Sequence, residues 1–187
     1  MVCYYFGTFN PVHNAHLKIA DEVKKLCAAE SFERVVFVPA FSPPHKDVEI
    51  APAQHRLNML KLAAGEENVS DIEYHLEPPS YTYKTIEKLG KCDFIIGFDA
   101  FKEIESWKNP EYLKEMLNFI VIPRRTGLTD ETFDNLKQKG YRFKILNLDF
   151  IDISSENIRR LIKAGESIKG LVPCAVEEYI YEHRLYR

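Results

Sequence analysis

Two histidines stand three positions apart in the segment GTFNPVHNAH, residues 7–16. His13 and His16 follow a glycine turn, where the apolar run VCYYF at 2–6 gives way to a helical pattern. Such a pair suits three kinds of site: a metal centre, a helix cap beside a packed ring, or a phosphate cradle. Zinc needs a third and usually a fourth ligand, and the neighbouring sequence supplies no obvious one.

The ordinary explanation of a histidine pair is that one ring caps a helix and the other is packed or exposed. Phosphate contact fits this position better, because Gly7 permits a tight exit from the strand and Asn10-Pro11 fixes a turn. A helix N-terminus also offers unpaired N–H groups and a positive dipole end to an anion. We therefore expect His13 and His16 to lie on one side of the first helical turn and face phosphate.

A second candidate anion site is ISSENIRR at 153–160. Ser154 and Ser155 would stand at a helix N-terminus, with Arg159 about one turn further on, so hydroxyls, backbone N–H groups and a guanidinium converge. The ordinary alternative is strong here too, since serine is a preferred cap and a surface arginine is usually only solvated.

The loop FSPPHKD at 41–47 presents His45 and Lys46 after a predicted strand. Prolines are common in loops, so the position at a strand exit is what favours a functional role. Further on, in PPSYTYKTIEKL at 78–89, Thr82 is expected to begin a helix, with Tyr81 or Tyr83 lining a pocket.

Asp99 lies just past the apolar run at 94–98, a position suited to binding ribose hydroxyls or a metal. Trp107, the only tryptophan, follows shortly after. A lone tryptophan belongs to a core more often than to a ligand platform.

Alternating elements must position these residues. Apolar runs at 2–6, 34–39, 94–98 and 119–123 predict buried strands, and weaker candidates lie at 69–74 and 143–146. Helical spacing appears between them in three stripes: Leu17, Ala20, Val23 and Cys27; Leu57, Leu60 and Ala64; and Tyr112, Leu113, Met116 and Leu117. The alternation indicates an α/β protein with a parallel sheet, whose ligands would bind beyond the carboxyl ends of the strands.

The chain changes character after Asp152. ISSENIRRLIKAG predicts a helix that begins at Ser154 or Ser155 and ends near Gly165, and CAVEEYIYEHRLY predicts another helix after Pro173. No repeat or low-complexity linker divides the sequence, so we expect a single domain over 1–187 with a C-terminal helical part at about 153–187.

Composition narrows the class of protein. A net charge of -3 gives no broad attraction to nucleic acid or anionic membrane, so anion binding must be local. No apolar run approaches the roughly 18 residues of a membrane span, and no secretory signal precedes the first strand, so a cytoplasmic location is expected. The four cysteines form no CxxC pair and are predicted to be small buried apolar residues.

Together these motifs resemble the nucleotidylyltransferase superfamily, which pairs a first-strand motif of the type GTFxPxHxGH with a late ISSxxIR motif. Within it, the chain is most similar to the bacterial nicotinate-nucleotide adenylyltransferases. The shared pieces are SPPHK at 42–46, SYTYKT at 80–85, IIGFD at 95–99 with Trp107 behind it, and LVPCAVEEYI at 171–180. The resemblance covers essentially the whole chain.

The resemblance implies a Rossmann-like, doubly wound parallel sheet with a small C-terminal helical element. It implies transfer of AMP from ATP to nicotinate mononucleotide, giving nicotinate adenine dinucleotide and pyrophosphate in NAD biosynthesis. The ATP site it implies consists of His13 and His16 on the phosphates, the adjacent turn Gly7, Thr8 and Phe9, and Ser154, Ser155 and Arg159 on the other side.

For the acceptor, the resemblance implies that His45 and Lys46 face its phosphate or the transferred group. The pyridine pocket would be lined by Thr82, Tyr83 and Trp107, with Asp99 near the nucleotide. The implied catalytic groups are His13, His16, Lys46 and Arg159. Mg²⁺ would arrive bound to the ATP phosphates without a dedicated protein cage. The expected partners are ATP and nicotinate mononucleotide, and no nucleic acid or membrane. A homo-oligomer is left open.

Two departures from the family pattern stand out. Ala15 replaces the usual glycine between the histidines, and it would be strained if that glycine needs a positive φ. Glu156 replaces a threonine in the late motif. A carboxylate is favourable at a helix N-terminus but repels ATP if it points inward, so we expect Glu156 to point outward.

Alternatives remain at this stage. The alternative acceptors are nicotinamide mononucleotide, which differs at one group, and phosphopantetheine, whose enzymes usually lack the PPHK and tryptophan elements. A non-catalytic nucleotide sensor is a further alternative, disfavoured because a sensor need not retain every charge-stabilising group. A nucleic-acid-binding module is disfavoured by the net charge and by the lack of a basic face interleaved with aromatics.

Overall fold

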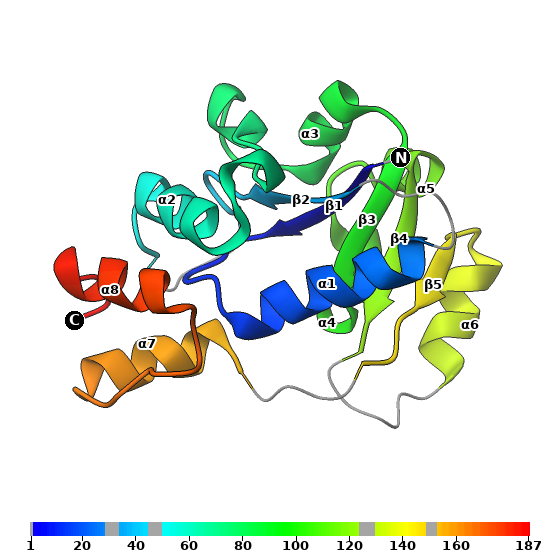
Figure 1. Ribbon diagram of the computed structural model, residues 1–187. Coiled ribbons are helices and arrows are strands. Elements are labelled where there is room, and N and C mark those ends of the chain that lie inside the picture. Colours follow the sequence, from blue (N-terminus) through cyan, green and yellow to red (C-terminus); the bar gives the residue numbers. More distant parts are fainter. Residues whose placement is uncertain (1, 29–33, 45–49, 124–129, 149–152) are drawn as a thin grey trace.

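The computed structural model describes residues 2–28, 34–44, 50–123, 130–148 and 153–187 (Figure 1). His45 and Lys46 lie outside these described residues. The strands are β1 (Val2–Gly7), β2 (Arg34–Pro39), β3 (Cys92–Gly97), β4 (Leu117–Ile122) and β5 (Phe143–Ile145). The helices are α1 (Asn14–Ala28), α2 (Ala53–Ala64), α3 (Thr82–Leu89), α4 (Phe98–Phe101), α5 (Pro110–Met116), α6 (Asp130–Gln138), α7 (Ser155–Lys163) and α8 (Cys174–Glu182), with short 3₁₀ turns at Glu66–Asn68, Ile72–His75 and Ile104–Ser106.

The strands form one parallel sheet in the order β2-β1-β3-β4-β5. The chain moves from β1 to β2 on one side and then crosses to β3 on the other, so the strand order reverses at β1. Gly7 pairs with Pro39 at the carboxyl end of this region, and Gly97 ends β3 on the same edge. Ligands of doubly wound sheets bind at such a point.

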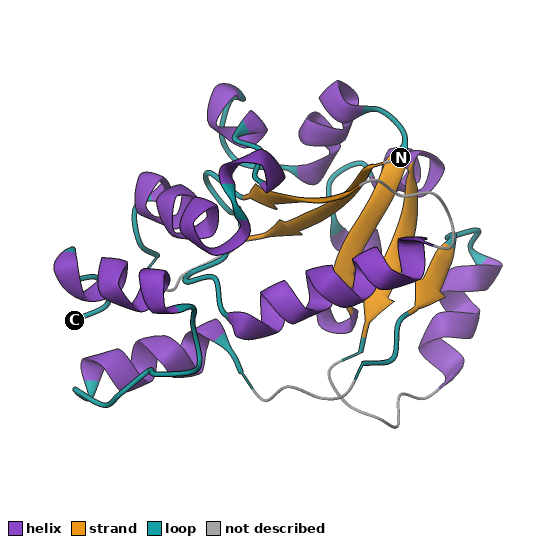
Figure 2. Cartoon of the chain, viewed as in Figure 1, coloured by secondary structure: helices purple, strands orange, loops and turns teal. Residues whose placement is uncertain are grey.

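Helices cover both faces of the sheet (Figure 2). Alternate side chains of the strands enter two clusters, as the two-residue period of a strand requires. One cluster joins β1 and β2 to α1, α2, α7 and α8, and the other joins β3 and β4 to α3, α4, α5 and α6. The predicted doubly wound α/β fold is confirmed. The C-terminal helices share the first cluster with the sheet, and the single-domain organisation stays a prediction that this packing supports.

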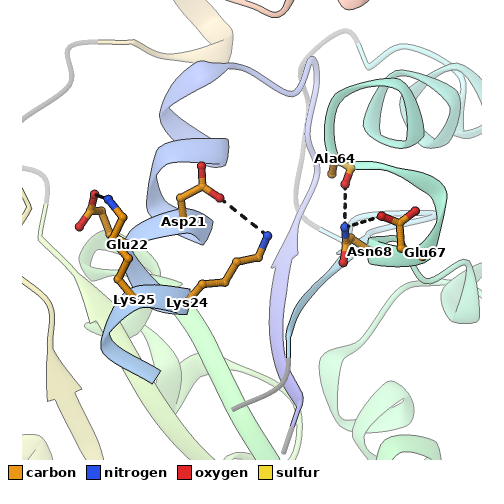
Figure 3. Close-up of polar contacts among 7 residues, drawn as sticks. All are labelled: Asp21, Glu22, Lys24, Lys25, Ala64, Glu67 and Asn68. Carbon is orange, nitrogen blue, oxygen red and sulfur yellow. Dashed lines mark hydrogen bonds and ion pairs between the residues drawn. The ribbon is translucent and has the colours of Figure 1, made fainter. Parts of the chain in front are cut away.

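Polar contacts connect side chains on the outer surface of α1 and at the end of α2 (Figure 3). On α1, Lys24 pairs with Asp21 at 3.7 Å and Lys25 with Glu22 at 2.7 Å. Exposed pairs of this kind contribute little stability because solvent screens them, so burial of the opposite face holds α1 in place. Asn68 donates a hydrogen bond to the Ala64 carbonyl at 2.8 Å and satisfies the end of α2.

Three predictions about the elements were wrong. The weak strand candidate at 69–74 makes only an isolated bridge, between Val69 and Phe37, because the chain then turns: Tyr74 N–H donates to the Asp71 carbonyl at 2.8 Å. Leu117 is the first residue of β4, not part of the helical stripe before it, because it pairs with Cys92 of β3.

Phe98, placed at the end of a strand, instead begins α4. Of the cysteines whose side chains are described, Cys3 and Cys92 are buried as expected, whereas Cys174 is exposed at the start of α8. Among the described helices, none is both long and apolar enough to cross a membrane.

Candidate active site

The turn that follows β1 is tightly packed. Phe9 is 3% exposed and adopts a φ of 50°, an uncommon conformation for a bulky residue. Its ring lies over Gly7, where an added Cβ would meet Phe9 Cζ at 2.9 Å. Glycine is therefore required at position 7 because the Phe9 ring occupies the space of a side chain.

The histidine pair stands at the start of α1. His13 immediately precedes the helix and is 5% exposed, and its ring stacks on that of His16 with centroids 3.6 Å apart. The His13 N–H donates to His16 Nδ1 at 3.2 Å, so His16 caps the helix from its third position, as glutamate does in a capping box. Nδ1 thus acts as acceptor, and the neutral His16 ring carries its proton on Nε2.

Aromatic neighbours fix the plane of the His16 ring. Phe9 and Tyr5 contact it edge-on, with centroids at 5.0 Å and 5.9 Å. The expectation that both histidines lie on the first helical turn needs correction, since His13 precedes α1. The close stacking also disfavours a positive charge on both rings at once.

The N-terminus of α1 offers fewer amides than expected. Asn14 N–H donates to the Leu171 carbonyl at 3.0 Å, and His16 N–H donates to the His13 carbonyl at 2.9 Å. The Asn14 side chain donates to the Gly170 carbonyl at 2.8 Å. These bonds attach the segment before α8 to the histidine turn, so side-chain donors have a larger part in any anion binding here.

The structure brings the late serine and arginine motif to the same turn. Ser155 Oγ donates to the Pro11 carbonyl at 2.8 Å, and Arg159 Nη1 donates to the Asn10 carbonyl at 2.8 Å. Ser154 is the N-cap of α7, where its Oγ accepts from Asn157 N–H at 3.1 Å. The two motifs are therefore neighbours in space, and the predicted contacts of their side chains with phosphate stay predictions.

The two departures from the family pattern are accommodated. Ala15 is buried inside α1 and has a negative φ, so no left-handed backbone strains it. Glu156 is exposed in the first turn of α7, as expected. Neither residue distorts the histidine turn.

Asn10 ties this turn to distant parts of the chain. It is 4% exposed, and its Oδ1 accepts from Ala51 N–H at 3.0 Å and from the Tyr186 hydroxyl at 2.9 Å. Burial is the main cause that raises the pKa of Tyr186, so this hydroxyl stays a donor at physiological pH.

A cavity of about 500 Å³ opens at the carboxyl ends of β1 and β3. Gly7 and Thr8 border it on the side of the histidine turn. Phe6, Phe94 and Trp107 give it an aromatic floor: Phe6 stacks on Phe94 at 4.6 Å, and Trp107 meets Phe94 edge-on at 6.4 Å. A flat ring would fit against this floor.

Thr82 begins α3 as predicted, and it lines the cavity. Its contact with a pyridine ring stays a prediction. Tyr83 does not line the cavity: its side chain packs beside the second core cluster, and Tyr81 lines the cavity instead. The reason is that α3 begins at Thr82, which rotates the next side chain away by about a third of a turn. Asp99 is exposed in α4 and is not among the residues that line the cavity.

Sequence reasoning missed two buried charged residues nearby, Arg56 and Glu73, which are 1% and 4% exposed. Glu73 lines the cavity and accepts from Thr85 Oγ1 at 2.9 Å and from Phe41 N–H at 3.3 Å. Burial raises the pKa of Glu73, and the hydrogen bonds it accepts oppose that rise. In the sequence, Arg56 lies in an ordinary helical pattern and Glu73 in a strand-like run, so neither gave a signal.

A protein-held Mg²⁺ site was tested against the donors present. Mg²⁺ prefers oxygen ligands, especially carboxylates. The turn at 7–13 together with His16, Ser155 and Arg159, called the histidine cradle below, instead presents imidazole, hydroxyl and guanidinium groups. No group of three or more His, Cys, Asp or Glu side chains in the described ranges could hold a metal ion. These donors suit an anion rather than a cation, and no chemical step is assigned to a metal.

Known proteins resemble this chain in sequence and fold. Residues 4–178 match the family model described as Cytidylyltransferase-like. A probable nicotinate-nucleotide adenylyltransferase of Caldicellulosiruptor saccharolyticus is 37% identical, covering 100% of this chain and 98% of the relative. One from Syntrophotalea carbinolica is 36% identical, covering 97% and 94%.

A similar fold is found in the solved structure of the Plasmodium falciparum nicotinic acid mononucleotide adenylyltransferase complexed with NaAD. Its TM-score is 0.78 at 24% identity, and the match covers 99% of this chain and 96% of that one. The chain therefore belongs to the cytidylyltransferase-like family and, within it, to the nicotinate-nucleotide adenylyltransferases.

Proposed function

We propose that this protein transfers AMP from ATP to nicotinate mononucleotide, forming nicotinate adenine dinucleotide and releasing pyrophosphate. One observation carries the proposal: the turn at Gly7 and Thr8 belongs to the histidine cradle and also borders the aromatic-floored cavity. A single turn shared by two subsites would bring a triphosphate next to a flat acceptor, which supports the proposal. The curated relatives are named for this activity.

The chemistry requires alignment more than a protein nucleophile. A phosphate oxygen of the mononucleotide attacks the α-phosphorus of ATP, and the bond from that phosphorus to the bridging oxygen breaks, so pyrophosphate departs with the electron pair. In this proposal His16 Nε2–H and the Arg159 guanidinium stabilise the charge on the departing group. His13 supports the His16 ring by stacking, and Lys46 remains a predicted contributor.

Mg²⁺ would come with ATP, held by phosphate oxygens. This follows from the donor set of the cradle, which complements phosphate rather than the cation. Bound in that way, the ion would neutralise charge on the phosphates.

The acceptor pocket is suited to a carboxylate. Tyr81 caps α3 without a side-chain hydrogen bond, and in the described structure no partner is found for the backbone N–H of Thr82 or Tyr83. Two such amides at a helix N-terminus favour an anion. The pyridine ring would stack near Trp107, with its carboxylate toward α3.

The test is pyrophosphate release from ATP and Mg²⁺ with three acceptors: nicotinate mononucleotide, nicotinamide mononucleotide and phosphopantetheine. We expect the first to give the highest kcat/KM. Equal use of the nicotinamide form would remove the specific assignment, and ATP binding without release for any acceptor would indicate a sensor.

Thr82 allows a sharper test of acid specificity. Thr82→Pro removes one N–H at the first helical position, where proline is tolerated, and Tyr81 already has the extended backbone (φ -83°, ψ 124°) that a following proline favours. Thr82→Ala is the matched control, because it removes the hydroxyl and keeps the N–H. The preference for the acid over the amide should fall in the proline variant and persist in the alanine variant.

A cytoplasmic location and a homo-oligomer stay predictions from the sequence.

A further inference from the structure

Arg56 of α2 is a fully buried arginine whose recorded acceptors, within the described residues, are all backbone carbonyls. Its Nε donates to Ala51 at 3.0 Å, and its Nη2 donates to Phe41 at 3.0 Å. Its Nη1 donates to both Thr8 at 2.9 Å and Ala40 at 2.6 Å. A buried guanidinium is costly unless its donors are satisfied, and burial lowers the pKa of Arg56 from its ordinary value.

Three of the four carbonyls lie at the exits of two adjacent strands. Thr8 lies in the turn after β1, next to the histidine cradle, whereas Ala40 and Phe41 form the exit of β2. Thr8 and Ala40 both line the acceptor cavity, and Arg56 does not. One guanidinium therefore links the exits of two adjacent strands from behind the cavity wall.

The β2 exit is also held from its other side. Phe41 N–H donates to Glu73 Oε2 at 3.3 Å, and Ser42 N–H donates to Ser80 Oγ at 2.9 Å. Ser80 N–H returns a bond to the Ser42 carbonyl at 2.8 Å. The Ala40 and Phe41 carbonyls thus accept from Arg56, and the Phe41 and Ser42 amides donate to Glu73 and Ser80. The Ala40 amide donates to the Gly7 carbonyl at 2.9 Å, so the main chain of this segment has little freedom.

We propose that Arg56 is a positioning residue for adenylyl transfer, holding the ATP-side turn and the acceptor-side wall at a fixed separation. It acts through Thr8 and Ala40 and contacts neither substrate. The inference deepens the proposed function and rests on it for the reaction, but not for the geometry of the two strand exits.

Arginine suits this task because its planar fork directs several N–H groups at once. Lysine keeps the charge but offers one compact ammonium, which cannot span the same carbonyls. Arg56→Lys is therefore the informative variant. Leu60→Ala is the matched control, since Leu60 lies one turn further along α2, is fully buried, and contributes packing but no hydrogen bond to either strand exit.

Two measurements on the full chain test the proposal. With ATP, Mg²⁺ and nicotinate mononucleotide, Arg56→Lys should lower kcat/KM by about 10²-fold, as a small misplacement of reacting groups does. Hydrogen exchange of the Phe41 and Ser42 amides, relative to the Ile95 amide in β3, should accelerate about tenfold, as the loss of a bond to a charged donor implies. Leu60→Ala should lower Tm. Its kcat/KM, and the exchange rates of its Phe41 and Ser42 amides relative to that of Ile95, should stay near the wild-type values.

Unchanged hydrogen exchange of the Phe41 and Ser42 amides in Arg56→Lys would overturn the inference, whichever reaction the protein catalyses. So would equal losses of kcat/KM in Arg56→Lys and Leu60→Ala. If Arg56→Lys accelerates hydrogen exchange but the wild type releases no pyrophosphate, the proposed function is wrong and the structural role of Arg56 stands. If Arg56→Lys does not fold, wild-type exchange decides: the Phe41 and Ser42 amides should open together with α2, and independent opening would refute the proposal.

Discussion

Gly7→Ala gives the most direct test of how the turn after β1 is built. The new methyl carbon would lie 2.9 Å from Phe9 Cζ and 3.1 Å from each neighbouring ring carbon. A displacement of about 0.5 Å is needed to reach the 3.4 Å at which ordinary van der Waals contact begins. Phe9 has little room to give, because Tyr5, His16 and Phe37 surround its ring at 5.6, 5.0 and 5.6 Å.

Overpacking at such a site costs about 1–3 kcal/mol, and we expect the free energy of unfolding to fall by that amount. The displaced Phe9 ring should also move the His16 ring it contacts, lowering kcat/KM about tenfold. Urea unfolding and pyrophosphate release measure the two effects. Gly97→Ala is the control for the unfolding measurement, because a methyl group there meets nothing within 4 Å and the backbone φ is -69°.

A double-mutant cycle isolates the contact with the ring. Phe9→Leu removes the ring atoms that the methyl group would meet, so Gly7→Ala should cost less in that background. An equal cost in both backgrounds, or a cost as small as that of Gly97→Ala, would refute the steric reasoning.

Three further predictions concern buried polar groups. His16→Ala should lower kcat on the order of 10²-fold and lose about 1 kcal/mol of cap stability. His16→Asn should recover the stability but not the turnover, because the asparagine Oδ1 can accept from His13 N–H. Full turnover in either variant would remove His16 from the mechanism. Since burial raises the pKa of Glu73 above 4.5, its stabilising contribution is complete below that pH and is lost as pH rises through the raised pKa. In urea titrations, Glu73→Gln should therefore gain on wild type as pH rises above 4.5 through the raised pKa, and a constant difference would contradict this. Tyr186→Phe should cost about 0.5–1.5 kcal/mol in thermal unfolding by removing a donor to Asn10, and an unchanged Tm would count against that bond.

Periodicity in the sequence was enough to predict the sheet. The apolar runs at 2–6, 34–39 and 119–123 and the weaker one at 143–146 became β1, β2, β4 and β5. The signature is continuous in β2, which is buried after its first residue, and weaker in the edge strand β5, where Lys144 and Ile145 are exposed. The run at 69–74 also contains β-branched and aromatic residues, but it is not a strand. Glu73 is buried and accepts from Thr85, and the Tyr74 hydroxyl donates to the Ala53 carbonyl at 2.6 Å, whereas Asp71 is exposed.

The candidate site was only partly predictable. His13, His16, Ser155 and Arg159 were brought together as the motifs suggested, since each motif carries its own turn chemistry. The choice between Tyr81 and Tyr83 depended on where α3 begins, which a one-residue shift decides. Arg56 was out of reach, because its acceptors are carbonyls and carbonyls leave no trace in residue types.

The hydrogen bonds of Asn10 set an order of events during synthesis of the chain. Its side-chain oxygen accepts from Ala51, 41 positions later, and from Tyr186, 176 positions later. The first bond becomes available early on the ribosome, but the second must wait until almost all of the sequence shown has been made. The nascent protein thus completes the hydrogen bonds of its histidine turn last, when the residues that follow α8 reach Asn10.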